Sequence, residues 1–100
     1  MVFETKIKDP AETLDYKFDW GSPGSAQPYL EPGETISAYT LGFPDGLTPE
    51  PGDAIVDGGR DVLFWVSGGT LGVTYGVTCL ITTNASRTAK RTMPIRIELR

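Results

Sequence analysis

The sequence contains no histidine among its 100 residues. Histidine is the side chain that most often serves as a general base near neutral pH, and it is the commonest metal ligand. Its absence excludes Ser–His and Cys–His catalytic arrangements. We therefore expect a protein that is not an enzyme and that uses no metal or cofactor.

Cysteine is also scarce, because Cys79 is the only one. A single cysteine forms no disulfide within the chain, which favours assembly in a reducing cytoplasm. Cys79 falls on the inward side of a predicted strand, where a free cysteine behaves as a small apolar side chain. The first residues, Met1–Lys6, lack the basic and apolar regions of a secretory signal, so we expect none.

Long apolar runs and excess positive charge are absent too. No apolar run approaches the roughly 20 residues of a membrane-spanning helix. The formal net charge is −4 and the pI is about 4.6. Nucleic-acid-binding proteins usually present a basic surface. We therefore expect neither a membrane nor a nucleic acid as partner.

The charges that are present are unevenly distributed. Residues 1–61 hold twelve acids and four bases, a sum of −8, whereas residues 87–100 hold five bases and one acid, a sum of +4. Two interpretations remain open. The two ends pair within one molecule, or the acidic part of one subunit contacts the basic part of its neighbour.

Glycine and proline are frequent, with 12 and 8 residues, and they separate short apolar stretches. Such punctuation is typical of strands joined by turns. Alternating or continuous apolar patterns predict strands over residues 14–20, 35–43, 61–67, 73–83 and 87–99. Residues 2–7 are a further candidate, and the Pro-rich stretch 49–60 is expected to be a loop around Ala54–Val56. Pro94 within the last strand indicates an edge or a bulge.

These patterns predict one all-β domain over residues 1–100, an antiparallel β-sandwich of six to seven strands. In the last strand we expect Met93, Ile95, Ile97 and Leu99 to point inward. Trp20 is expected in the core. The motif Gly72-x-x-Tyr75-x-Val77 resembles the tyrosine corner of immunoglobulin-like and fibronectin-III-like sandwiches, which implies that the Tyr75 hydroxyl bonds back to nearby backbone.

A wider resemblance covers nearly the whole chain. It is carried by five ordered segments: Asp19-Trp20, Gly33–Ile36, Gly46–Thr48, Val66–Thr70 and Ile81–Thr88. The series is similar to a family of small tailed-bacteriophage virion proteins described as fibre–tail adaptors. The resemblance implies a structural role in joining tail parts, location in the virion tail, multiple copies, and other phage tail proteins (a tail ring or tube and the fibre) as partners.

The strand at residues 61–67 carries two apolar rows, and a sandwich buries only one side of each sheet. Either Val62, Phe64 and Val66 or Leu63 and Trp65 should therefore face a partner or a covering loop. The residues we predict to bind partners are Leu63, Trp65, Lys90, Arg96, Tyr29 and Leu30, the last two as exposed apolar side chains in a polar loop. The alternative function is a module that binds a host surface or carbohydrate through exposed aromatics.

Four aspartates, Asp45, Asp53, Asp57 and Asp61, lie close together in the sequence. Their spacing differs from that of an EF-hand loop, whose ligands occupy alternate positions. We therefore expect solvated loop carboxylates and not a calcium site.

Overall fold

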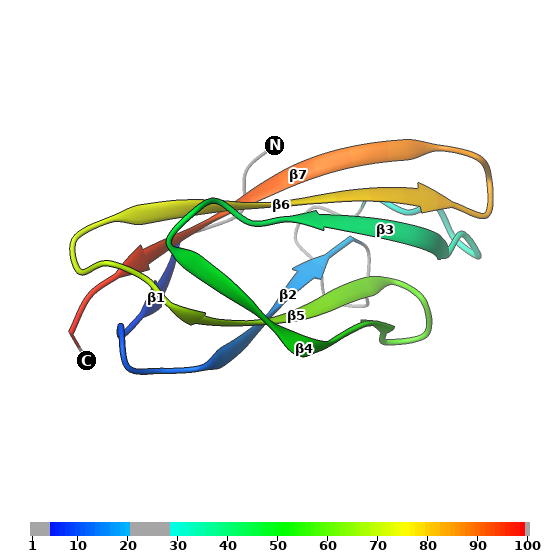
Figure 1. Ribbon diagram of the computed structural model, residues 1–100. Helices are drawn as coiled ribbons and strands as arrows, with labels where there is room; N and C mark the ends of the chain where they lie inside the picture. The colour runs from blue at the N-terminus through cyan, green and yellow to red at the C-terminus, as the bar shows by residue number, and fades with distance from the viewer. Residues whose placement is uncertain (1–4, 21–28, 100) are drawn as a thin grey trace.

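The computed structural model describes residues 5–20 and 29–99, which form seven strands and no helix (Figure 1). No segment of this described part is a helix long and apolar enough to cross a membrane. The strands are β1 (Lys6–Lys8), β2 (Leu14–Asp19), β3 (Ile36–Gly42), β4 (Leu47–Val56), β5 (Asp61–Gly68), β6 (Thr74–Thr83) and β7 (Thr88–Ile97).

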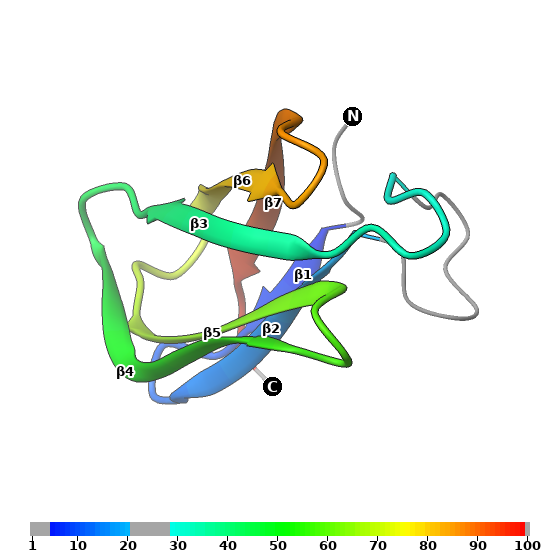
Figure 2. The same cartoon turned by 90° about the vertical axis from the view of Figure 1, so that its right-hand side faces the viewer.

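The strands build two sheets that pack face to face (Figure 2). One sheet has the order β1-β7-β6-β3 and the other the order β2-β5-β4. The prediction of an all-β sandwich with six to seven strands is confirmed. Strands β2, β5 and β4 occupy the places of B, E and D in a constant-type immunoglobulin sandwich, and β3, β6 and β7 those of C, F and G.

One pairing departs from the antiparallel expectation. Strand β1 runs parallel to β7, with Lys6 opposite Ile95 and Lys8 opposite Ile97. This pairing covers only the end of β7. Pro94 comes just before the residues of β7 that pair with β1, so among the described residues one side of β7 is unpaired at this position. The N–H that proline lacks therefore removes no hydrogen bond between strands.

The core lies between the sheets and is filled by the inward rows of the central strands. Val62, Phe64 and Val66 of β5 are fully buried, and in β6 the row from Tyr75 to Ile81 alternates with exposed or half-buried residues. The Phe18 and Phe64 ring centroids are 5.4 Å apart. Trp20 is fully buried, as predicted.

The expectation of a loop at residues 49–60 was wrong for most of its length. Strand β4 continues through Pro49 and Pro51 to Val56 and pairs with β5, apart from a shift in register between Glu50 and Ala54. Because β4 is an edge strand, prolines can face its unpaired side, and the irregularity accommodates Gly52 at a φ of 117°.

Two further expectations at the chain ends need correction. Leu99 does not point into the core, because β7 ends at Ile97 and Leu99 is 75% exposed. The strand expected at residues 2–7 is found as β1 at Lys6–Lys8, and the first part of that range lies outside the described residues.

Candidate functional site

The outer face of the β2-β5-β4 sheet presents the row that contains Leu63 and Trp65. Because the alternate residues Val62, Phe64 and Val66 fill the core, Leu63 and Trp65 point outward and are half-buried. This placement agrees with one of the two orientations left open by the sequence. Partner binding by these two side chains remains a prediction.

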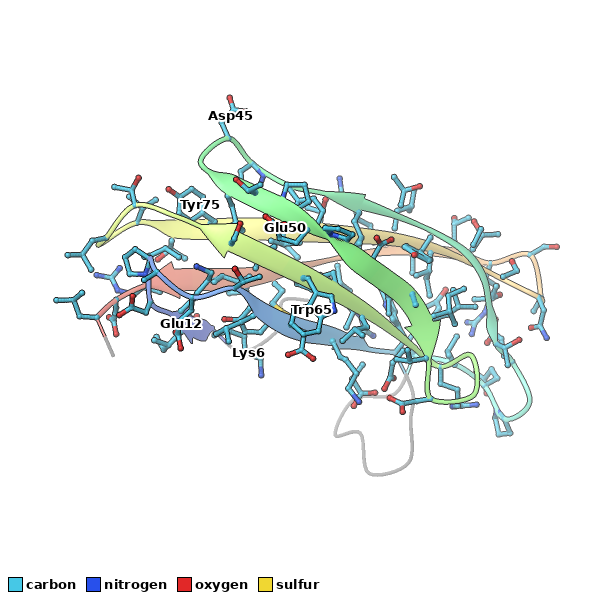
Figure 3. All side chains as sticks on the ribbon, turned by 60° about the horizontal axis from the view of Figure 1, so that its bottom comes forward. Lys6, Glu12, Asp45, Glu50, Trp65 and Tyr75 are labelled. Atoms are coloured by element: carbon cyan, nitrogen blue, oxygen red, sulfur yellow. The ribbon has the colours of Figure 1, made fainter. Side chains whose placement is uncertain are left out.

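Trp65 rests on the irregular part of β4. A Cβ added at Gly52 would lie 2.9 Å from Trp65 Cδ1, so the indole occupies space that only glycine leaves free. Asp15 of β2 and Glu50 of β4 are the residues opposite Trp65 in the two neighbouring strands. Figure 3 labels Trp65 and Glu50 on this sheet. Ser67 Oγ donates to Glu50 Oε2 over 2.6 Å. The result is a half-buried aromatic ring between two carboxylates.

More carboxylates lie at the other end of this face. Lys17 Nζ is 2.7 Å from Asp57 Oδ2 and 3.7 Å from Asp61 Oδ2. The Asp61 side chain is 1% exposed, and its Oδ1 is buried without a hydrogen-bond partner. Burial, followed by the hydrogen bond to Asp57, raises the pKa of Asp61 to about 7, while the pKa of Asp57 is lowered. Apart from Lys17, this part of the face is acidic.

Asp61→Asn should remove a pH dependence of stability. A carboxyl whose folded pKa is raised stabilises the fold most below its ordinary pKa of 3.8, and that contribution is lost as pH rises through about 7. As pH rises from 4 to 8, we expect the free energy of unfolding of the variant to increase by roughly 1–2 kcal/mol relative to that of wild type. Denaturant unfolding at several pH values measures this. Asp15→Asn controls for net charge, and a constant difference between Asp61→Asn and wild type would contradict the assignment.

The outer face of the four-stranded sheet has a different character. Lys90 and Arg96 are exposed on β7, as expected for its outward row. Arg96 Nε is 2.8 Å from Glu98 Oε1, so this arginine is already paired. Exposed Leu80 lies opposite Lys90, and the remaining outward positions are largely threonine and glycine. Partner binding by Lys90 and Arg96 remains a prediction.

The two apolar residues of the predicted loop behave differently. Tyr29 is half-buried, its ring packs edge-on against Trp20, and the Arg87 guanidinium lies 4.5 Å above it. Leu30 is only 5% exposed and belongs to the core, so its expected exposure was wrong. The backbone N–H groups of both residues donate to the Trp20 carbonyl, which draws this segment onto the end of the sandwich.

The same end contains a partly buried ionic cluster that the sequence did not reveal. Glu34 accepts hydrogen bonds from both Arg87 Nε and Arg87 Nη2 and from Thr83 Oγ1. The Arg87 contacts, then that of Thr83, lower the pKa of Glu34 to about 2. Glu34 and Arg87 are 53 residues apart, so this pair supports the interpretation that the acidic and basic parts pair within one molecule.

Lys8 is a second charged residue that sequence reasoning missed. Its side chain is fully buried, and its Nζ donates to the carbonyls of Gly68 (2.6 Å) and Asp9 (2.9 Å). Burial lowers the pKa of Lys8. A period-two interpretation of Lys6, Ile7 and Lys8 would place the isoleucine inside and the lysines outside. In the structure Ile7 is half-buried and Lys8 is the fully buried residue, so the local pattern points to the wrong row.

Tyr75 joins the β5–β6 turn to the core. Its hydroxyl accepts a 2.9 Å hydrogen bond from the Thr70 backbone N–H, and its ring is 7% exposed. This contact has the form of the tyrosine corner that the sequence motif resembles. Gly46, at a φ of 98°, leaves the space for the hydroxyl, since a Cβ there would lie 2.9 Å from it.

Tyr75→Phe should lower the free energy of unfolding by about 1 kcal/mol. The ring continues to fill the core, but the Thr70 N–H loses its acceptor. Equilibrium denaturation measures the difference, with circular dichroism to verify that the fold is retained. Unchanged stability would show that the hydroxyl makes no net contribution.

The four neighbouring aspartates do not converge. The expectation of solvated loop carboxylates was wrong for Asp61, which begins β5 and whose side chain is 1% exposed. Asp53 Oδ2 accepts a hydrogen bond from the Tyr39 hydroxyl, Asp57 and Asp61 contact Lys17, and Asp45 is exposed in the β3–β4 turn. Within residues 5–20 and 29–99, no group of three or more His, Cys, Asp or Glu residues is arranged to hold a metal ion. Cys79 is fully buried, and burial raises the pKa of its thiol to about 12.

Residues 8–96 match the family model described as podophage GP4 fiber-tail adaptor protein gp77. The chain belongs to this fiber-tail adaptor family. No curated protein matches the chain.

Membership in the fiber-tail adaptor family makes the chain a component of the phage tail with a structural role, and it implies interaction with other phage tail proteins. The matched range includes β2 to β6 completely, the last residue of β1, and β7 apart from Ile97. It also contains the Leu63, Trp65, Lys90 and Arg96 positions and the Glu34–Arg87 cluster, so the surfaces described above lie within the matched range.

Proposed function

We propose that this adaptor joins the fibre to the tail without catalysing a reaction, and that it does so through the two outer faces of its sandwich. One face carries Leu63 and Trp65 among carboxylates. The other carries Lys90, Arg96 and Leu80 among threonines. The proposal places a different tail protein on each face.

The observation that carries this proposal is the chemical difference between the two faces of a single packed core. A joining protein needs two surfaces that do not compete for one partner. The acidic residues of one face and the exposed Lys90 of the other support such selectivity, because like-charged partners are rejected and oppositely charged partners are attracted. A half-buried tryptophan is also the type of side chain that most often dominates an interface.

A non-catalytic role is supported by the chemistry of the side chains. The sequence has no histidine. Cys79 is buried with a raised pKa, which leaves little thiolate to act as a nucleophile. The pKa of Asp61 is raised, but the Asp61 carboxylate already contacts Lys17 and Asp57. We further propose that several copies act in each virion, that they assemble in the host cytoplasm, and that neither nucleic acid nor membrane is a partner.

The alternative, binding of a carbohydrate on a host surface, is favoured by one feature. Trp65 lies between Asp15 and Glu50 in the sheet register. An indole ring can stack on a sugar, and neighbouring carboxylates can accept hydrogen bonds from its hydroxyl groups. A glycan array probed with wild type and Trp65→Ala separates the two functions. Glycan binding that disappears in the variant would favour the alternative, and an array without binding would remove it.

A bridging assay tests the adaptor role. The purified fibre protein is immobilised, the adaptor is added, and the phage's tail protein is then passed over the surface. We expect the tail protein to be retained only when the adaptor is present, and each partner to bind the adaptor separately. Retention of the tail protein without the adaptor, or competition between fibre and tail protein for the adaptor, would contradict the proposal.

A further inference from the structure

Strand β3 forms an end of the four-stranded sheet and pairs only with β6 among the described residues. Its residues, Ile36–Gly42, include no charged side chain and no proline. Its one irregularity lies between Ile36 and Ala38, and the Ile36 N–H donates to the Gly59 carbonyl at 2.8 Å. The edge from Ala38 to Gly42 is therefore regular, and no strand within residues 5–20 and 29–99 pairs with its outer side.

The other edges of the sandwich carry features that block strand addition. Edge strand β4 contains two prolines and a shifted register at Gly52. In strand β2 the charged residues Asp15, Lys17 and Asp19 alternate with apolar residues. The edge of β7 has Lys90 and Pro94 before β1 covers its end. Charges, prolines and bulges are the usual protections of exposed edges, and β3 has none along Ala38–Gly42.

The carboxylate of Asp53 lies beside the middle of β3 and indicates which charge a strand added to this edge should carry. Tyr39 is the central residue of β3, and its hydroxyl donates to Asp53 Oδ2 over 2.6 Å. If β3 of a second copy paired antiparallel around Tyr39, both Asp53 side chains would be brought together, and like charges side by side disfavour that arrangement. A partner strand with a basic side chain next to Tyr39 would place opposite charges together.

We propose that the β3 edge binds an extended segment of about six residues from a tail partner, with a lysine or arginine beside Tyr39 and Asp53. Backbone hydrogen bonds to β3 supply the attachment, and the basic side chain supplies the selectivity. This mode deepens the proposed adaptor function, on which the choice of partner rests. It adds a third contact surface to the two sheet faces.

The test uses the full chain and synthetic peptides. Fifteen-residue peptides tiled across the phage's fibre and tail proteins are screened for binding, and hydrogen exchange of the adaptor is measured with each peptide that binds. We expect amide exchange in residues 38–42 to slow at least tenfold at saturation, while exchange in β2 stays unchanged. We also expect the binding peptides to contain a lysine or arginine within an otherwise uncharged stretch.

A charge reversal tests the selectivity. Asp53→Lys should weaken binding of the basic peptides at least tenfold, and peptides with glutamate at the same position should then bind better than the originals. Asp45→Lys makes the same charge change in the exposed β3–β4 turn and should have a smaller effect. Equal effects of the two variants would overturn the selectivity.

The remaining outcomes are decisive as well. Peptide binding without protection of residues 38–42, or no peptide binding while the intact partners still bridge, would overturn the edge inference and leave the adaptor role standing. Concentration-dependent protection of β3 without any peptide would show that a second copy is the occupant. Failure of both peptides and intact partners would overturn the adaptor role itself.

Discussion

Trp65→Ala should weaken binding of one tail partner at least roughly 30-fold and leave binding of the other unchanged. Trp65 is the larger of the two half-buried apolar side chains, Leu63 and Trp65, on the outer β2-β5-β4 face, and its indole occupies the space next to Gly52. Aromatic side chains of this kind commonly contribute more than 2 kcal/mol to an interface. Surface plasmon resonance against the fibre and the tail protein separately gives the two dissociation constants.

Two controls define what this result would mean. Leu71→Ala removes an exposed apolar side chain from the β5–β6 turn, away from both sheet faces, and should change neither dissociation constant more than about twofold. Lys90→Glu should instead weaken the second partner, with an effect that diminishes as salt is raised. Equal losses for both partners in Trp65→Ala would indicate a general disturbance of the fold, and no loss would remove this face from the proposal.

Glu34→Ala should lower the melting temperature by roughly 10 °C or more. The carboxylate accepts hydrogen bonds from Arg87, from Thr83 Oγ1 and from the Glu31 backbone N–H, so its loss releases the loop before β3 from the β6–β7 hairpin. Glu31→Ala removes an exposed carboxylate three residues away but keeps that backbone donor, and it should change the melting temperature little. Similar effects of the two variants would contradict the role of the cluster.

The same cluster predicts a pH dependence of opposite sign to that of Asp61. Because the pKa of Glu34 is lowered to about 2, its stabilising contribution is present above the ordinary value of 4.5 and is lost as pH falls through about 2. The difference in stability between wild type and Glu34→Gln should therefore be largest above pH 5 and should diminish in strong acid. Thermal unfolding between pH 2 and pH 7 measures this, and a difference independent of pH would contradict it.

Period-two patterns were sufficient to predict most of the fold. The alternation in residues 73–83 located β6 and its inward row, including Tyr75 and Cys79, because a half-buried strand must expose every second residue. The Pro-rich β4 was missed because proline and glycine usually mark loops. An edge strand tolerates them, and edge position is a property of the sheet order, which a single strand's sequence does not contain.

The candidate surfaces could be predicted only in part. The two rows of β5 were visible in the sequence, and the rule that one face is buried limited the choice to Leu63 and Trp65 or the alternate row. Leu30 was misplaced because its burial depends on hydrogen bonds from the loop to the Trp20 carbonyl. The Glu34–Arg87 pair and the unprotected β3 edge arise from long-range arrangement, which leaves no local pattern.

A cryo-EM reconstruction of the phage particle tests the central claim most directly. The account predicts repeated copies of this chain between the fibre and the tail, with the Trp65 face against one partner, the Lys90 face against the other, and an added strand along β3. Density that places the chain elsewhere in the particle, or that places both partners on a single sheet face, would contradict it.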